Sequence, residues 1–547
     1  MIPEGERTAR RGADRDGLLH PRLREAARLI KIGQAAPAAG ILRDYLKRHP
    51  RDGRALHLLA GIARSGGRLA HALELLARAV ECAPDLLVAR CDYAAALLEA
   101  HRPDAAFSQT EELLKRDGRE PAYRALRARA LEALDDYAGA ADIWRRLLDD
   151  QPENIQYWTR YAWALRALGR SDETIAAYRK VIALQPGFGG VWWNLADLKT
   201  YRFSDAEIGR MDAAIATPGI PAEDRACLHF ALGKAYADRG LYESSFGNYA
   251  KGNAIRRLSI AHDPDVLTAY VARAKRVFRP DVFESFADCG SDSREPIFVV
   301  GMMRSGSTLV EQILASHSQV EGTRELPEIA AISRHLQQRA SQAADEYPGF
   351  LERIEADALR DLAARYLETA RAHCRLGRPF FIDKMGANFA HVGLIRLLFP
   401  KSRIVDVRRH PLACGFSIFS QYFPEGQNNT FRLADIGRHY RDYVELMAHF
   451  DRVLPGAVHR IFYEDLVVDT EAGIRRLLGY LELPFEEACL DFHRTKRPVA
   501  TVSAEQVRMP IYHAALERWR NYERWLGPLK SGLEPVLESY PLVPEFD

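Results

Sequence analysis

A 34-residue period runs through this 547-residue chain from Ala26 to Ala196. Small residues need little room where two helices approach closely, and a proline at the end of a repeat stops one helix before the next begins. Both kinds of residue recur in phase, so the period predicts a stack of helical hairpins. The closing positions are Pro50, Pro84, Gly118, Pro152 and Pro186, and the two series of small residues are Ala26, Ala60, Ala94, Ala128, Ala162 and Ala196, and Ala38, Ala72, Ala106, Ala140 and Thr174.

The repeat resembles the tetratricopeptide repeat (TPR), a helix–turn–helix unit with this period. Ile155–Pro186 is the best-formed unit, a sixth unit begins at Gly189 and loses phase after Lys199, and a further hairpin is expected over Ala226–Asn253. The other units are Leu19–Pro50, Gly53–Pro84, Leu87–Gly118 and Pro121–Pro152. Arrays of this kind present a concave face to an extended peptide. We therefore expect the array to bind a protein or peptide, with scaffolding or homodimer formation as the alternative.

The array defines the expected domains. Residues 1–17 are polar and are expected to be disordered. Residues 18–275 are expected to form an all-α TPR-like solenoid, and residues 276–547 a second domain of a different kind. The fold class that follows is α plus α/β.

Composition excludes several classes of function. The net charge of +2 implies no general affinity for nucleic acid. The seven cysteines form no CxxC pair, which argues against a zinc site or a disulfide framework and favours a reducing compartment. No apolar run approaches the length of a membrane span, and the N-terminal residues contain no apolar signal segment. We expect a cytoplasmic protein without a transmembrane segment.

A phosphate-binding loop is predicted after the array. Pro296–Gly301 has the apolar, β-branched composition of a buried parallel strand, and a helical pattern begins at Ser307. Strand, glycine-containing loop and helix start together aim backbone N–H groups at a phosphate. The spacing is that of a P-loop, but Ser307 stands where nucleotide triphosphatases carry lysine. The cation within the loop is Arg304, and the other expected phosphate contacts are Ser305, Gly306, Ser307 and Thr308.

The segment RSGSTL resembles the 5′-phosphosulfate loop of sulfotransferases that use 3′-phosphoadenosine 5′-phosphosulfate (PAPS). The resemblance implies a P-loop α/β fold with a central parallel sheet, and PAPS as co-substrate. In that family an arginine at a strand end and a serine eight residues later hold the 3′-phosphate. Arg409 and Ser417 have this spacing. Arginine offers phosphate a bidentate fork, and serine adds a neutral donor.

Further segments resemble the tyrosylprotein sulfotransferase branch of the family. Tyr463-Glu-Asp-Leu matches a stretch whose tyrosine contacts the nucleotide, and Ser503-Ala-Glu-Gln-Val-Arg-Met-Pro510 matches another cofactor segment. Arg518 falls where the family has a cofactor-binding lysine. The resemblance covers Pro296–Trp525. It implies that Tyr463, Ser503 and Arg518 contact the cofactor.

Sulfuryl transfer needs a base for the acceptor hydroxyl and a cation for the leaving phosphate. The resemblance implies that Glu325 is the base, with Glu328 as the alternative, that Lys384 stabilises the leaving group, and that Arg304 shares in catalysis. The cytosolic branch uses histidine as base, so His317, His391 and His410 are further alternatives. No metal-ligand cluster is visible in the sequence, and this mechanism requires no metal.

These patterns predict a PAPS-dependent sulfotransferase whose acceptor is a hydroxyl group, in our preferred interpretation the tyrosine of a protein captured by the TPR array. Two alternatives stay open. One is a P-loop nucleotide kinase or NTPase, against which the missing loop lysine and the Arg409/Ser417 pair argue. The other is a sulfotransferase for a small molecule or glycan, with the array as a scaffold.

Overall fold

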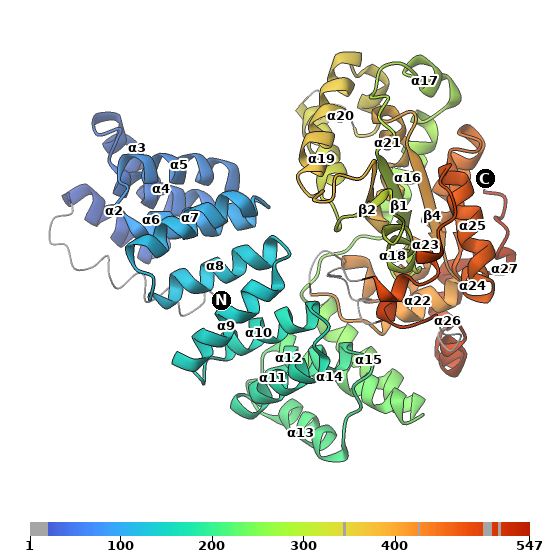
Figure 1. Ribbon diagram of the computed structural model, residues 1–547, viewed down its shortest axis with the longest axis horizontal. Coiled ribbons are helices and arrows are strands. Elements are labelled where there is room, and N and C mark those ends of the chain that lie inside the picture. Colours follow the sequence, from blue (N-terminus) through green and yellow to red (C-terminus); the bar gives the residue numbers. More distant parts are fainter. Residues whose placement is uncertain (1–19, 343–345, 425–426, 496–505, 512–515, 547) are drawn as a thin grey trace. The chain divides into compact units, whose positions relative to one another are not determined.

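The computed structural model describes residues 20–342, 346–424, 427–495, 506–511 and 516–546 (Figure 1). The segment predicted to be disordered, residues 1–17, lies outside this set. Helical hairpins precede a parallel five-stranded sheet with helices on its faces, so the predicted α plus α/β class is confirmed. Compactness divides the chain into two units, between Gln185 and Pro186.

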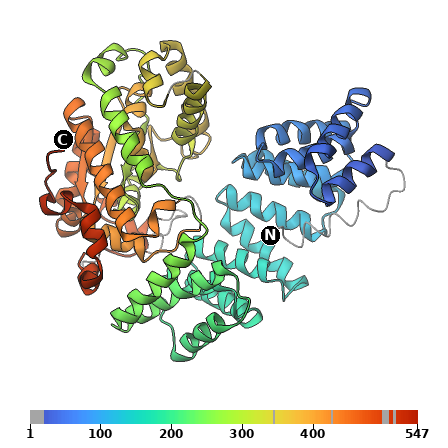
Figure 2. The same cartoon turned by 180° about the vertical axis from the view of Figure 1, so that it is seen from behind.

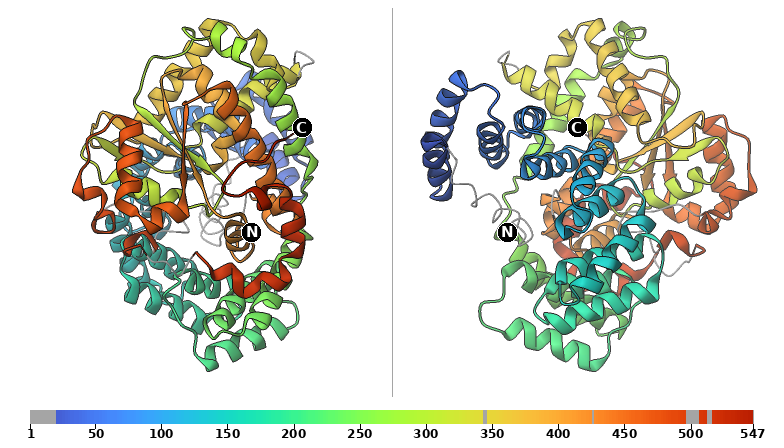
Figure 3. Two further views of the ribbon diagram at one scale, coloured as in Figure 1. Left: turned by 90° about the vertical axis from the view of Figure 1, so that its right-hand side faces the viewer. Right: turned by 60° about the vertical axis from the view of Figure 1, so that its left-hand side comes forward.

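The first unit is a run of antiparallel helix pairs, which stack one after another in Figure 3. Each pair after the second begins 34 residues after the one before it. Its helices are α2 (Pro21–Lys31), α3 (Ala35–Arg48), α4 (Gly53–Ser65), α5 (Leu69–Cys82), α6 (Leu87–Glu99), α7 (Pro103–Arg116), α8 (Pro121–Ala133), α9 (Tyr137–Asp150), α10 (Ile155–Ala167) and α11 (Ser171–Leu184). Every residue of the two phased series is fully buried. The only polar one, Thr174, donates its hydroxyl to the backbone oxygen of Arg170 at 2.9 Å. The phase therefore records close helix contact, as predicted.

Helices also open the second unit: α12 (Gly189–Asp197), α13 (Asp205–Ala216), α14 (Ala222–Asp238), α15 (Tyr242–Arg257), α16 (Asp265–Val277) and α17 (Pro280–Ser285). These helices belong to the same compact unit as the sheet, not to the unit formed by α2–α11. The cause is aromatic packing, because α12, α14 and α15 bury rings against the segment from Phe416 to Trp525. The predicted boundary between residues 275 and 276 marks the change of architecture and stays a prediction; it is not where compactness divides the chain.

The sheet is parallel throughout, in the order β2-β3-β1-β4-β5. Its strands are β1 (Pro296–Gly301), β2 (Val320–Gly322), β3 (Phe380–Lys384), β4 (Arg403–Arg408) and β5 (Val458–Phe462). The helices that follow them are α18 (Ser307–Ala315), α19 (Glu328–Gln342), α20 (Ala356–Arg371), α21 (Val392–Leu398), α22 (Pro411–Phe419), α23 (Leu433–Val453), α24 (Tyr463–Val468), α25 (Thr470–Leu481), α26 (Gly527–Leu533) and α27 (Val536–Ser539). The predicted strand at Pro296–Gly301 is the central one, buried over its whole length.

Helices cover both faces of the sheet, as a buried parallel sheet requires. On one face, α18 and α25 pack into a core with β1, β3 and β4, to which Val299 and Val405 contribute. On the other, Phe298 meets Tyr366 of α20, with ring centroids 5.8 Å apart. Figure 2 shows α19 and α20, in yellow and olive, together at one side of the sheet. Both cores leave the carboxyl ends of the strands as the edge where loops gather.

Candidate active site

The carboxyl edge of the sheet collects nearly all the predicted site residues. β1 ends at Gly301, β3 at Lys384 and β4 at Arg408, so the phosphate loop lies between the ends of two neighbouring strands. The chain places β3 on one side of β1 and later β4 on the other. Such a switch in strand order opens a crevice outside the carboxyl ends, where ligands bind in folds of this type.

The loop from Met302 to Gly306 has an unusual backbone. Arg304 adopts a left-handed conformation with φ of 63°, which costs free energy in a residue with a side chain. Gly306 has φ of 103°, and a Cβ atom there would overlap the ring of Tyr463. Only glycine fits at this position, so Tyr463 packs directly on the loop, next to the start of α18.

Ser305 provides a test of whether the loop suits a phosphate. Its side chain is fully buried, and its hydroxyl has no hydrogen-bond partner among the described residues. An unsatisfied buried hydroxyl costs about 1–3 kcal/mol, so a ligand oxygen at this place would remove a penalty. Backbone N–H groups at the start of a helix favour an anion in the same place. The loop therefore fits the phosphate end of the cofactor that the sequence implies.

The two predicted phosphate-binding segments meet in the structure. The Arg304 Nε atom donates to Ser417 Oγ at 3.2 Å, which joins the loop to α22. Arg409 donates to the backbone oxygen of Arg304 at 3.3 Å. The Arg409 guanidinium also lies over the Tyr463 ring, 4.9 Å from its centre. Residues from three separate parts of the sequence thus form one cation-rich cluster at the loop.

A second cluster lies at the end of β3. The Lys384 ammonium contacts the Glu325 carboxylate at 2.5 Å and Glu311 of α18 at 3.8 Å. Lys384 and Glu311 are buried, whereas the Glu325 side chain is half exposed and reachable from solvent. Sequence reasoning missed Glu311, although a carboxylate within the apolar helix STLVEQILA was a visible signal. The predicted base and the predicted leaving-group cation are therefore direct neighbours.

Glu328 has different surroundings. It begins α19, and its side chain contacts His373 at 3.7 Å. Beside it lies Asp383, a fully buried carboxyl to which Tyr366 donates at 2.7 Å. Burial raises the pKa of Asp383 to about 7, against the hydrogen bond from Tyr366, and the Glu328 carboxylate raises it further. Glu328 thus acts on the buried Asp383, whereas the half-exposed Glu325 contacts Lys384 directly.

Replacing Asp383 by asparagine is expected to change how stability depends on pH. The folded protein holds the Asp383 proton up to pH of about 7, while the unfolded chain releases it near its ordinary pKa of 3.8. Wild-type stability therefore falls as pH rises between these values, and the substituted protein lacks this component. Thermal unfolding from pH 5 to pH 8 measures the difference between the two slopes. Parallel curves would contradict the buried, protonated carboxyl.

The surroundings of the three histidines considered as alternative bases do not favour that role. His317 is fully buried, with Nε2 at 2.9 Å from the Pro484 oxygen and Nδ1 accepting from the Gln319 N–H. His410 stacks on Trp519, with ring centroids 5.0 Å apart. Burial lowers the pKa of His391 to about 4. These surroundings favour Glu325 as the base.

Two further predicted cofactor contacts lie near the C-terminus. Arg518 begins the 3-10 helix η9 (Arg518–Trp525), and its guanidinium is 6.0 Å from the ring of Phe416, the neighbour of Ser417. Ser503 lies outside the described residues. The loop positions Ser307 and Thr308 form the first turn of α18.

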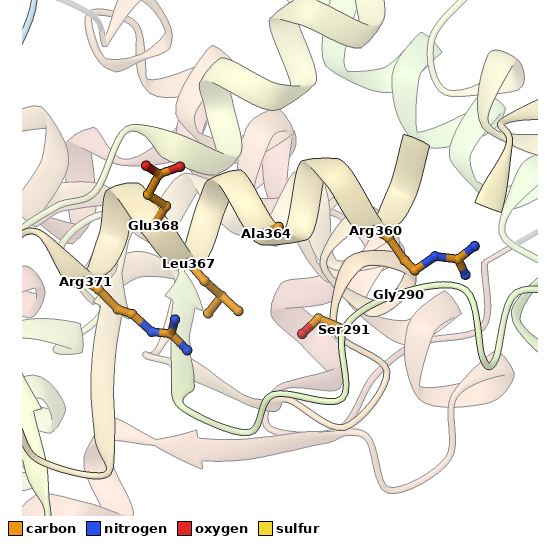
Figure 4. A pocket seen from close by; sticks show the side chains of 7 residues that line it. All are labelled: Gly290, Ser291, Arg360, Ala364, Leu367, Glu368 and Arg371. Atoms are coloured by element: carbon orange, nitrogen blue, oxygen red, sulfur yellow. The ribbon is translucent and has the colours of Figure 1, made fainter. Parts of the chain in front are cut away.

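A cavity of about 600 Å³ lies near the amino end of β1, and Figure 4 shows the residues that line it. Gly290 and Ser291 line it on one side and Arg371 of α20 on the other. Because these residues lie near the start of β1, the cavity is separate from the site at the strand ends. In the part of the chain described here, no group of histidine, cysteine and acidic side chains could hold a metal ion. No described helix is both long and apolar enough to cross a membrane.

Comparison with known proteins assigns both parts of the chain to families. Residues 296–487 match the sulfotransferase family, and residues 23–86 and 126–188 match the tetratricopeptide repeat. This chain carries a sulfotransferase domain behind TPR repeats. The matched span of the sulfotransferase domain contains the phosphate loop, Glu325, Lys384, Arg409, Ser417 and Tyr463. The predicted combination of a sulfotransferase-family domain with TPR repeats is confirmed.

Relatives resemble the chain over different lengths. An uncharacterized protein of Aquifex aeolicus is 31% identical over 80% of this chain and 60% of its own length. Protein-tyrosine sulfotransferase 1 of Danio rerio is 26% identical over 41% of this chain and 65% of its own, and protein-tyrosine sulfotransferase of Drosophila melanogaster 24% over 41% and 46%. The chain thus spans about half to two thirds of these relatives. The sulfotransferase domain of a Synechococcus PCC 7002 olefin synthase overlaps 42% of this chain and 89% of that domain, with 19% identity and a TM-score of 0.31.

Proposed function

We propose that the protein transfers a sulfuryl group from PAPS to a hydroxyl acceptor, with tyrosine of a protein or peptide as the acceptor. The observation that carries the proposal is the Lys384–Glu325 pair at 2.5 Å, next to a phosphate loop with an unsatisfied Ser305 hydroxyl. Bound PAPS would supply the sulfuryl group at its 5′-phosphosulfate end. The named sulfotransferase relatives act on protein tyrosine, which supports that acceptor.

Each residue of the site has a task in this proposal. Ser305 and the first turn of α18 hold the 5′-phosphate end. Arg409 and Ser417 hold the 3′-phosphate, and Tyr463 braces Arg409 through the contact between ring and guanidinium. Glu325 accepts the proton of the acceptor hydroxyl.

Lys384 has two roles here. It fixes the Glu325 carboxylate by direct contact, and it stabilises negative charge on the leaving oxygen. Glu311, 3.8 Å away, keeps the lysine at the end of β3. The TPR array would capture the polypeptide that carries the tyrosine, because repeats of this type bind extended chains. Homodimer formation and a cytoplasmic location stay predictions of the sequence.

Transfer of labelled sulfate from PAPS to a tyrosine peptide tests the function directly. Mass spectrometry of host proteins treated with the enzyme and PAPS would identify sulfated tyrosine. Label moving from ATP with magnesium, and none from PAPS, would favour the nucleotide kinase instead. Sulfation of a small phenol or glycan, with protein tyrosine left unchanged, would retain the enzyme class and replace the acceptor.

Replacing Arg409 by alanine is expected to remove most of a preference for 3′-phosphoadenosine 5′-phosphate over 5′-AMP. Charge-assisted hydrogen bonds are worth about 1.5–3 kcal/mol, so the loss should be at least about tenfold in affinity. Calorimetry with both nucleotides measures it. Arg403→Ala, at the amino end of the same strand and paired with Glu482, is the matched control. Wild-type protein that binds both nucleotides equally would refute the cofactor assignment.

A further inference from the structure

The repeat pattern changes at α12, and the segment that follows α12 contacts the end of α22. Helices α4, α6, α8 and α10 each have 13 residues, whereas their counterpart α12 has 9. α12 begins on the repeat phase, and α13 resumes it 34 residues after α11 begins. The chain therefore gives up one helical turn between Asp197 and Asp205 without losing register. Lys199 lies in this gap, with φ of 62°.

Lys199 belongs to a hydrogen-bonded network at the end of α22. Its ammonium contacts Asp197 at 2.9 Å and donates to Gln421 Oε1 at 3.0 Å. Gln421 in turn donates its amide to Asp197 at 3.0 Å. Asp197 and Gln421 are buried, so the contacts among these three polar groups are shielded from water and strengthen one another. Gln421 stands four residues after Ser417, two residues beyond the end of α22.

The same end of α22 collects two other cations. Arg304 contacts Ser417, and Arg518 lies over the ring of Phe416. Burial lowers the pKa of Lys199 against the attraction of Asp197, and the nearby Arg304 and Arg518 guanidiniums lower it further. Three cations thus converge on one helix end, and one of them comes from the shortened helical hairpin. Neighbouring like charges repel, so their convergence favours a site that receives an anion.

We propose that Lys199 is a positioning residue of the cofactor site, supplied by the helical part of the second unit. It fixes Gln421, and through Gln421 the turn of α22 that carries Ser417. It also adds a third positive charge beside Arg304 and Arg518. The inference rests on the proposed function, because its expected ligand is the 3′-phosphate of the nucleotide.

Lys199→Met removes the charge and both contacts while keeping an apolar stem against the Trp193 ring, which lies 5.3 Å from the ammonium. We expect about a tenfold loss of affinity for 3′-phosphoadenosine 5′-phosphate, the range for losing a charge-assisted hydrogen bond. Affinity for 5′-AMP should change much less. Lys199→Arg, which keeps a charged donor, should restore most of the preference. Lys251→Met, at an exposed position of α15, is the matched control and should behave as wild type.

Calorimetry of the full chain with the two nucleotides, together with thermal unfolding, decides the matter. Loss of the 3′-phosphate preference with 5′-AMP binding intact, and rescue by arginine, supports the proposal. Wild-type affinity of Lys199→Met overturns it and leaves the proposed function standing. Equal loss of both nucleotides, or an unfolded variant, assigns Lys199 to stability alone and also overturns it. A wild-type protein without the preference overturns the proposed function as well.

Discussion

Glu325→Gln is expected to lower turnover by about 10²–10⁴-fold, the usual contribution of a general base. Glutamine keeps the size of the side chain and an oxygen for Lys384, but it cannot accept the acceptor proton. Cofactor affinity should hardly change, because Glu325 is not among the residues assigned to binding the nucleotide. Single-turnover rates with a tyrosine peptide, and calorimetry with 3′-phosphoadenosine 5′-phosphate, measure the two effects separately.

Glu328→Gln is the matched control for this result. Glu328 is also a carboxylate close to Glu325 in the sequence, but it begins α19, contacts His373 and acts on the buried Asp383. We expect this variant to retain most of its activity. An active Glu325→Gln enzyme beside an inactive Glu328→Gln enzyme would move the base by three residues.

A fragment of residues 186–547 is expected to fold and bind the nucleotide, whereas a fragment of residues 276–547 is expected to do neither. The shorter fragment lacks α12–α15, and these helices cover α22 and η9. Phe246 stacks on Trp525, with ring centroids 5.1 Å apart, and Ser245 Oγ lies 2.9 Å from the Tyr522 hydroxyl. Asn253 donates to the backbone oxygen of Phe419 at 2.9 Å.

The expected effect is large because burial of one apolar side chain stabilises the fold by about 1.5–3 kcal/mol. The free energy of unfolding of a whole domain is only about 5–15 kcal/mol. Removing α12–α15 would expose Phe416, Phe419, Tyr422 and Trp525 together. Circular dichroism during thermal unfolding, with calorimetry of nucleotide binding, compares the two fragments. Cooperative unfolding and full nucleotide affinity of residues 276–547 would show that the helical hairpins are dispensable.

The sequence predicts the elements of this fold well because their signals are local. The phased alanines indicate helix contacts within one hairpin. The apolar, β-branched composition of Pro296–Gly301 indicates the strand before the phosphate loop, and the structure buries all six of its residues. The meeting of Arg304 with Ser417 was less accessible to such reasoning, because 113 residues separate them. The resemblance to one family assigned both segments to the same cofactor, but it did not predict this contact.

The parts that escaped prediction depend on contacts across long separations. Glu311 was visible as a carboxylate in an apolar helix, but its neighbour Lys384 belongs to a strand far along the chain. The sequence analysis expected the repeat to lose phase after Lys199, but α13 begins 34 residues after α11, so only α12 is shortened. The partner of Lys199, Gln421, is 222 residues away and could not be recognised from the sequence. The packing of α12–α15 on the sheet domain escaped prediction for the same reason, because an aromatic residue in the sequence does not indicate which distant residue it will contact.

The uniform hairpins before residue 186 and the altered one after it differ in how freely evolution can change them. The uniform hairpins follow one 34-residue period, so equivalent residues make the contacts between neighbouring hairpins. A whole 34-residue block can therefore be gained or lost while these contacts are kept. The hairpin that begins at α12 has no such freedom, because its Lys199 and Asp197 are tied to Gln421. Proteins of this architecture should therefore vary in the number of repeats before α12, whereas the hairpin that begins at α12 should keep its length.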